Sequence, residues 1–241
     1  MTQYENEVKK RDVMCCMNAG NQGCGRKWSR MRIITDTGTD ILDKEAKKLG
    51  IELVAIRSNF TDTVFSENTE AEFTRFYDKL RQTDTLPVSS QPSPAEFLEL
   101  FEDAKEKEEE VVVITISSKL SGTYNGAMLA KDMAEYDNIY VVDSLLASLS
   151  ERLLVEYAVK LRDAGMGAKE LVQKLEQDRE RVILTGVPST LLYLKMGGRI
   201  SPVVAAVGGV IGIKPVLWLK DGVIESRSKA RGMRMAKSGM Q

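Results

Sequence analysis

Blocks of apolar residues alternate with amphipathic stretches from residue 31 onward, and this pattern predicts strands and helices in turn. The nearly continuous apolar blocks predict strands at residues 32–35, 52–56, 111–116 and 139–142. Apolar positions at helical spacing predict helices at residues 40–49, 70–80, 94–107, from 122 onward, and at 149–161. The first part of the chain therefore alternates strand and helix, which is typical of a parallel sheet covered on both faces.

Two polar stretches separate these elements. Residues 57–69 predict a loop, and so does PVSSQPSP, whose prolines forbid a continuous helix. The helix that follows has a clear start, because Ser93 is a capping residue, Pro94 takes the first helical position and Glu96 stands three residues after the cap.

The second part of the chain has a different pattern. It predicts helices at residues 169–177 and 189–195, a strand at 182–187 and a hairpin in KPVLWLKDGVIESR, since Asp-Gly between alternating runs is a strong hairpin signal. The apolar residues 200–213 predict a buried helix or a strand and turn, and the basic stretch from 226 to the end predicts the first turns of a helix.

These elements predict an α/β protein of two lobes, in which ligands are expected at the carboxyl ends of the parallel strands. We expect a three-layer α/β/α lobe with a mainly parallel sheet at residues 31–160, and a second α/β lobe with mixed or antiparallel strands at 161–241. Residues 1–30 are polar and lack periodicity, so we expect a disordered or artefactual extension there.

Charge and composition argue against nucleic-acid binding and membrane insertion. The chain has 34 basic and 35 acidic residues, a net charge of −1, which gives no general attraction to nucleic acid or to an anionic membrane. No apolar run approaches the roughly 20 residues of a membrane span, and the N-terminus lacks a signal peptide's apolar core. We therefore expect a cytoplasmic protein without stable membrane insertion or nucleic-acid binding.

The absence of histidine removes the commonest general base and zinc ligand. The cysteines, Cys15, Cys16 and Cys24, lack a C-x-x-C spacing and histidine partners. We therefore expect neither a metal site nor a cofactor.

Serine-rich loops are the candidate chemical features. Ser89-Ser90 and residues 117–123 each follow a strand or precede a helix, and Asp36 ends the first strand. Hydroxyls beside helix N-termini suit a negatively charged group, because the amides and the helix dipole there favour anions. The same serines are equally well explained as ordinary helix caps.

Ser121 is the candidate nucleophile of an alternative function, a small-molecule hydrolase or transferase. SKLSGT differs from the G-x-S-x-G elbow, Ser121 does not begin an S-x-x-K motif, and no histidine is available to activate the hydroxyl. These observations disfavour nucleophilic catalysis, so we expect a binding protein without its own catalytic activity.

From residue 31 onward the chain resembles the DegV family of fatty-acid-binding proteins. The resemblance rests on six motifs in order: IITDTGTDI, LPVSSQPSPAEF, ISSKLSGTYNGA, VVDSLLASL, LYLKMGGRIS and IKPVLWLKDGVI. It implies a two-lobed protein that binds one long-chain fatty acid between its lobes. It also implies that the protein presents the carboxyl group to a partner fatty-acid kinase, which forms an acyl phosphate.

The resemblance also assigns site residues. The family's carboxylate-binding hydroxyls correspond to Ser89 and Ser121, and Ser90 and the backbone of Gly122 are weaker candidates. Arg199 in MGGRIS matches a family arginine, which we expect near the head group or the partner.

The chain also departs from the family pattern. The first motif is D-T-G-T-D where the family has D-S-T-x-D, and Ser150-Glu151-Arg152 replaces a stretch that tends towards glycine and glutamine. The family's C-terminal G-x-H-x-G-P-G segment has no counterpart, so we expect the second lobe to be incomplete.

Overall fold

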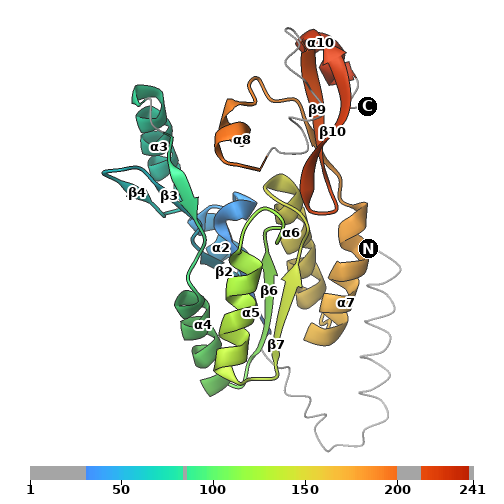
Figure 1. Ribbon diagram of the computed structural model, residues 1–241. Coiled ribbons are helices and arrows are strands. Elements are labelled where there is room, and N and C mark those ends of the chain that lie inside the picture. Colours follow the sequence, from blue (N-terminus) through green and yellow to red (C-terminus); the bar gives the residue numbers. More distant parts are fainter. Residues whose placement is uncertain (1–30, 84–85, 200–212, 239–241) are drawn as a thin grey trace, which may run out of the picture.

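A parallel sheet of four strands forms the centre of the first lobe (Figure 1). The computed structural model describes residues 31–83, 86–199 and 213–238. The sheet has the order β2-β1-β6-β7 and consists of β1 (Met31–Asp36), β2 (Glu52–Val54), β6 (Glu110–Thr115) and β7 (Ile139–Asp143). Every pair in it is parallel, as the apolar runs predicted.

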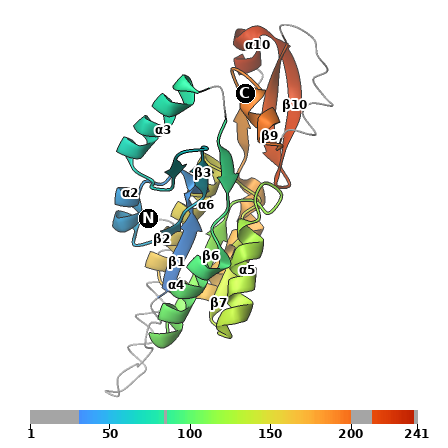
Figure 2. The same cartoon turned by 60° about the vertical axis from the view of Figure 1, so that its left-hand side comes forward.

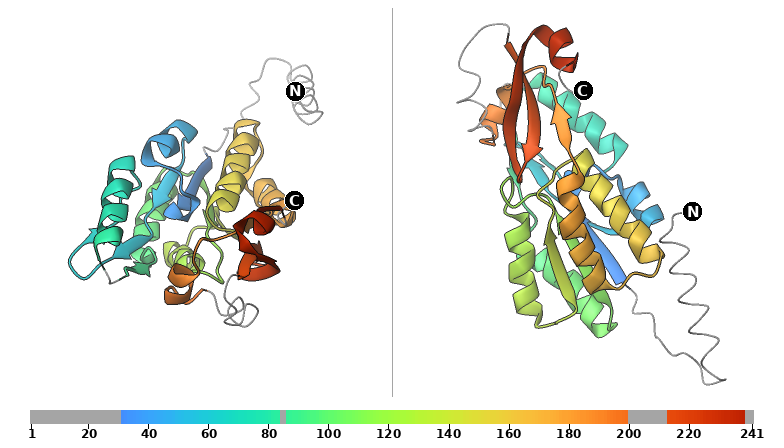
Figure 3. Two further views of the ribbon diagram at one scale, coloured as in Figure 1. Left: turned by 90° about the horizontal axis from the view of Figure 1, so that it is seen from above. Right: turned by 90° about the vertical axis from the view of Figure 1, so that its right-hand side faces the viewer.

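Helices cover both faces of this sheet, because side chains alternate between the faces along a strand. In β6, Val111 and Val113 pack with one helix group, whereas Val112 and Ile114 pack with the other. The first group consists of α4 (Pro94–Glu106) and α5 (Thr123–Ala134), and the second of α2 (Asp43–Leu49), α6 (Leu149–Asp163) and α7 (Ala168–Asp178). Figures 2 and 3 show the two groups from different sides.

A small antiparallel sheet beside the first lobe was not predicted. It has the order β4-β3-β5 and consists of β3 (Arg57–Asn59), β4 (Val64–Phe65) and β5 (Val88–Ser90). The interpretation of both polar stretches as loops was therefore wrong in part. These strands have two or three residues and lack an apolar run. They form because distant segments pair, which the local sequence pattern does not indicate. The helix α3 (Glu70–Gln82) lies between β4 and β5 in the chain, as predicted.

The second lobe contains an antiparallel sheet with the order β10-β9-β8. Its elements are β8 (Leu184–Gly186), α8 (Leu192–Met196), β9 (Ile213–Lys220), β10 (Val223–Arg231) and α10 (Gly232–Ser238). The Asp-Gly hairpin is confirmed, with Val223 opposite Lys220. The predicted C-terminal helix was wrong up to residue 231, because β10 continues along β9 as far as the pairing of Arg231 with Ile213.

The predicted fold class is confirmed, since a mixed α/β chain combines a parallel sheet with antiparallel strands in a second region. The lobe boundaries stay predictions; α7, which the predicted division assigns to the second lobe, packs on β6 and β7. The N-terminal extension with its cysteines, and nearly all of the apolar segment 200–213, lie outside the described residues.

Candidate functional site

The loop that follows β6 is held at its base by two carboxylates from neighbouring strands. Asp36, at the end of β1, accepts hydrogen bonds from Gly38 N–H through Oδ1 (2.9 Å) and from Ile116 N–H through Oδ2 (2.8 Å). Asp143, at the end of β7, accepts one from Ser118 N–H through Oδ1 (3.1 Å). The carboxyl ends of parallel strands meet at one sheet edge, so these acids fix the start of the loop from both sides.

Ser117 organises the rest of this loop. Its carbonyl oxygen accepts hydrogen bonds from Leu120 N–H (3.0 Å) and Ser121 N–H (3.1 Å). The Ser121 hydroxyl is 2.8 Å from that of Thr123, the first residue of α5, and accepts a longer bond from the Thr123 N–H (3.4 Å). The loop therefore delivers Ser121 directly to a helix N-terminus, where negative charge is favoured.

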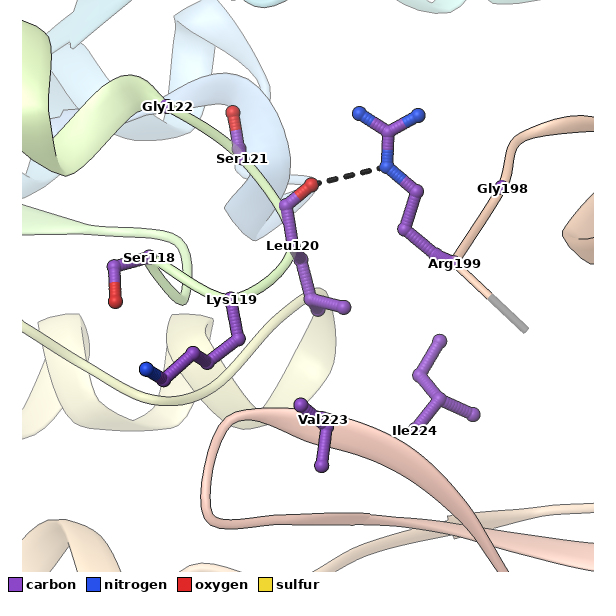
Figure 4. A pocket seen from close by; sticks show the side chains of 9 residues that line it. All are labelled: Ser118, Lys119, Leu120, Ser121, Gly122, Gly198, Arg199, Val223 and Ile224. Atoms are coloured by element: carbon purple, nitrogen blue, oxygen red, sulfur yellow. Dashed lines mark hydrogen bonds between the residues drawn. The ribbon is translucent and has the colours of Figure 1, made fainter. Parts of the chain in front are cut away.

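A pocket of about 440 Å³ lies between this loop and the second lobe (Figure 4). Its lining contains two cationic side chains and no carboxylate. The lining residues are Ser118, Lys119, Leu120, Ser121, Gly122, Gly198, Arg199, Val223 and Ile224. The lining therefore carries positive charge from Lys119 and Arg199, serines and the start of α5, which favours an anion, and it includes apolar groups from both sides.

Arg199 crosses from the second lobe to the loop. Its Nε–H donates to the carbonyl oxygen of Leu120 (3.0 Å), and its Nη1 bonds to the carbonyl oxygen of Gly197. Figure 4 shows the guanidinium group extending towards Leu120 beside Ser121. Three of the predicted site residues, Ser121, Gly122 and Arg199, thus line one pocket.

The other two predicted residues, Ser89 and Ser90, lie on β5 and do not line this pocket. Both are exposed, and the Ser90 hydroxyl accepts a hydrogen bond from Asn59 Nδ2 (2.9 Å). The next residue, Gln91, reaches the site, because a Cβ at Gly122 would lie 1.9 Å from its Oε1 atom. The β5 segment therefore contacts the N-terminus of α5 through Gln91.

A second cavity of about 310 Å³ lies between the first-lobe loops and α3. Its lining combines aromatic side chains, among them Phe65, Phe73 and Phe76, with the carboxylates of Asp40, Glu67 and Glu72. These acids make it unfavourable for an anionic head group, in contrast to the pocket at Ser121.

Two buried acids lie beneath the site. Burial raises the pKa of Asp36 to about 6, although its two backbone hydrogen bonds oppose the shift. Burial also raises the pKa of Glu151 well above its usual range, and the nearby charges of Asp36, Asp40 and Asp143 add to the effect. Glu151 is 0% exposed and neither carboxylate oxygen has a hydrogen-bond partner, so its neutral form is favoured.

The sequence did not single out Asp143, Gly222 or Gln91 as site residues. It placed Ser117 in a serine-rich candidate loop without assigning it a role, and it placed Asp36 at the end of a strand. An acidic residue directly after an apolar strand, in IITD and VVD, was the available signal for the two aspartates. In the part of the chain that the structure describes, no cluster of His, Cys, Asp or Glu is arranged to hold a metal ion. Within the same residues, no helix is long and apolar enough to traverse a bilayer.

The family model described as an uncharacterised protein of the DegV family matches residues 30–240. The chain belongs to the DegV family. A DegV domain-containing protein of Caldanaerobacter subterraneus is 32% identical over 207 residues, which are 86% of this chain and 74% of that protein.

Solved DegV structures share the fold. A fatty-acid-binding DegV family protein from Thermus thermophilus has a TM-score of 0.78 and 32% identity, with 87% of this chain and 74% of that chain covered. The fatty acid kinase B3 protein of Streptococcus pneumoniae, solved with linoleic acid, has a TM-score of 0.74 and 29% identity, covering 88% and 76%. Both of these solved proteins bind a fatty acid.

Proposed function

We propose that this chain binds a long-chain fatty acid with its carboxylate in the pocket at Ser121. The observation that carries the proposal is the lining of that pocket, which holds Lys119 and Arg199 but no carboxylate. The start of α5 adds a favourable dipole, and the Ser121 hydroxyl adds a hydrogen-bond donor. The fatty acids bound by relatives of the same fold support this assignment.

We assign Ser89 and Ser90 to the same head group, with Ser89 facing Ser121 across the site as the second hydroxyl. Both serines are exposed on β5, which leaves them accessible to a ligand. The side chain of the next residue, Gln91, lies against Gly122 at the start of α5. The protein would then hold the carboxylate at its surface for a partner fatty-acid kinase, and the similarity to the kinase B3 protein supports this partner.

The free energies expected for burying the acyl tail and for binding the carboxylate differ, and they give the two ends of the fatty acid different roles. Burial of about 14 methylenes at about 0.8 kcal/mol each gives roughly 11 kcal/mol of driving force. Hydrogen bonds to a carboxylate contribute about 1.5–3 kcal/mol each, partly cancelled by its desolvation. The tail therefore sets the affinity, and the hydroxyls set the orientation of the reactive end.

The alternative, a hydrolase or transferase that uses Ser121, has less support. A nucleophilic serine needs a neighbouring base, and the Ser121 hydroxyl is instead paired with the hydroxyl of Thr123. The chain contains no histidine that could take that role.

The direct test is to purify the protein from cells, denature it and identify the released lipid by mass spectrometry. We expect about one long-chain fatty acid per chain. If no fatty acid is retained, and none binds when a C16 or C18 acid is added to the folded protein, the carrier function is excluded.

The role of the hydroxyls is tested with Ser89→Ala and Ser121→Ala, singly and together, and with Ser228→Ala as a matched control on the exposed part of β10. We expect the double variant to retain the fold and to lose acyl-phosphate formation by a fatty-acid kinase with ATP, whereas Ser228→Ala behaves as wild type. Normal acyl-phosphate formation by the double variant would overturn the assignment of these serines.

A further inference from the structure

One buried hydrogen bond joins the turn of the β9–β10 hairpin to the loop that carries Ser121. The Ser117 hydroxyl donates to the carbonyl oxygen of Gly222 at 2.7 Å, although the two residues are 105 positions apart. Ser117 is 0% exposed and Gly222 is also buried, so the bond is shielded from competition by water.

Ser117 connects this bond to the site. Its N–H donates to the carbonyl oxygen of Leu146 (2.8 Å), and its hydroxyl accepts a bond from Lys119 N–H (3.2 Å). Its carbonyl oxygen holds the N–H groups of Leu120 and Ser121. A displacement of Ser117 would therefore move the Ser121 backbone directly.

Gly222 is packed closely against Ser117 and its neighbours, with no room for a side chain. Its φ of +83° belongs to the left-handed region that favours glycine. A Cβ there would lie 2.5 Å from Ser117 Oγ and 3.1 Å from side-chain atoms of both Leu145 and Lys119. The next residues in the chain, Val223 and Ile224, line the pocket opposite the Ser121 loop.

We propose that Ser117 and Gly222 are positioning residues, whose hydrogen bond fixes the separation between the Ser121 loop and the Val223–Ile224 side of the pocket. The loop side of the pocket starts directly after Ser117, and the hairpin side starts directly after Gly222. The hydrogen bond between these two residues is therefore the point about which the hairpin would pivot if the pocket widened. The inference deepens the proposed function, on which its ligand-binding consequence rests.

Amide hydrogen exchange of the ligand-free protein tests the coupling itself. Ser117→Ala removes the donor with little change in volume. The matched control is Ser150→Ala, because Ser150 is also buried and its hydroxyl bonds only to the backbone of Ala147. We expect Ser117→Ala to accelerate exchange about tenfold at both residues 118–121 and 223–224, with the rate of global unfolding unchanged.

Ser150→Ala should leave exchange in both of these segments as in wild type. Acceleration in Ser117→Ala that is confined to its own loop, with residues 223–224 unaffected, would overturn the proposal, and so would unchanged exchange in both segments.

Ligand release provides the second readout, with cis-parinaric acid as the fluorescent fatty-acid probe. Ser117→Ala should release the probe about tenfold faster, equivalent to about 1.4 kcal/mol, and Ser150→Ala should release it at the wild-type rate. Equal release rates in the two variants would overturn the ligand-binding consequence. If wild-type protein binds no probe, the proposed function fails, and the exchange experiment still decides whether the two segments are coupled.

Discussion

The parallel sheet and the β9–β10 hairpin differ sharply in how they are supported. Residues 111–115 of β6 are all 0% exposed between two helix layers, whereas no residue of β10 is buried. The buried apolar side chains described on the hairpin strands, Pro215, Val216, Leu217 and Leu219, all belong to β9. The strands of the sheet are therefore held by packing between two helix layers, while the position of the hairpin turn depends on a few individual contacts with the first lobe.

The largest expected difference is in the free energy of unfolding, when one core residue of the first lobe and one of the hairpin are each changed to alanine. Phe101 is 0% exposed between α4 and the sheet, and Phe101→Ala should lower the free energy of unfolding by about 3–5 kcal/mol. Leu217 packs only against partly buried neighbours, so Leu217→Ala should cost about 2 kcal/mol, the low end for such changes. Urea unfolding measures both; equal losses would contradict the contrast between the two regions.

The next effect concerns Glu151, which among the described residues of the first lobe is the one buried acid whose carboxylate has no hydrogen-bond partner. A carboxyl with a raised pKa keeps its proton in the folded protein after the unfolded chain has released its own. Stability is therefore lost as pH rises from the ordinary glutamate pKa through the raised one, by up to about 1.4 kcal/mol per pH unit. Glu151→Gln keeps two polar atoms in place, removes this slope and should be the more stable protein at pH 8.

Urea unfolding from pH 4 to pH 8 checks this result. The matched control is Glu156→Gln on the same helix, because Glu156 is partly exposed and paired with Arg152. That variant should keep the wild-type slope. Parallel pH curves for wild type and Glu151→Gln would show that Glu151 ionises freely in the folded protein.

Substitutions of Asp36 and of Asp143 can be compared to test whether the loop after β6 is held by hydrogen bonds or by packing. Asp36 uses both carboxylate oxygens, one for Gly38 N–H and one for Ile116 N–H. Asp143 accepts from both Ser118 and Leu145 through Oδ1 alone. An asparagine has one acceptor oxygen, so Asp143→Asn can keep both bonds whereas Asp36→Asn must lose one.

We therefore expect Asp36→Asn to accelerate hydrogen exchange at the amide of Gly38 or Ile116 by about fivefold, the equivalent of one lost hydrogen bond of ~1 kcal/mol. Asp143→Asn should leave the amides of Ser118 and Leu145 protected. Protection of all four amides in both variants would show that packing alone holds the loop.

The same contrast explains which elements the sequence predicts. β6 is buried at every residue after Glu110 and carries a continuous apolar run, and β1 and β7 carry shorter apolar runs with buried residues, so their positions follow from pattern alone. β5 is exposed at every residue and exists because it pairs with β3, about thirty positions earlier. The C-terminal stretch has a helical composition, and its pairing with β9 overrides that preference as far as Arg231.

Site residues divide in a similar way. The motif around Ser121 and the arginine of MGGRIS could be recognised along the chain, and the structure brings them to one pocket. The contacts that position them, Asp36 with Ile116 and Ser117 with Gly222, join residues 80 and 105 positions apart. No local pattern encodes such distances, and the fold must be known before they can be inferred.

The smallest expected effect distinguishes Gly122, which lines the pocket, from Gly222 in the hairpin turn beside it. Gly122 has φ −79°, which any residue adopts, and the three atoms nearest to its added Cβ all belong to the end of the exposed Gln91 side chain. Gly122→Ala should therefore change stability by less than about 0.5 kcal/mol, as surface changes usually do. Gly222→Ala should cost at least about 1–2 kcal/mol, because its backbone is left-handed and its Cβ would meet buried atoms.

Binding of cis-parinaric acid shows whether the Gln91 contact matters despite this small cost. If Gln91 keeps the Ser89–Ser90 segment against α5, Gly122→Ala should weaken binding a few-fold by displacing it. The double variant Gly122→Ala with Gln91→Ala should then bind no more weakly than Gln91→Ala alone, because the displaced contact is already absent. Additive losses in the double variant would instead mean that Gly122 acts through its own backbone at the start of α5, independently of β5.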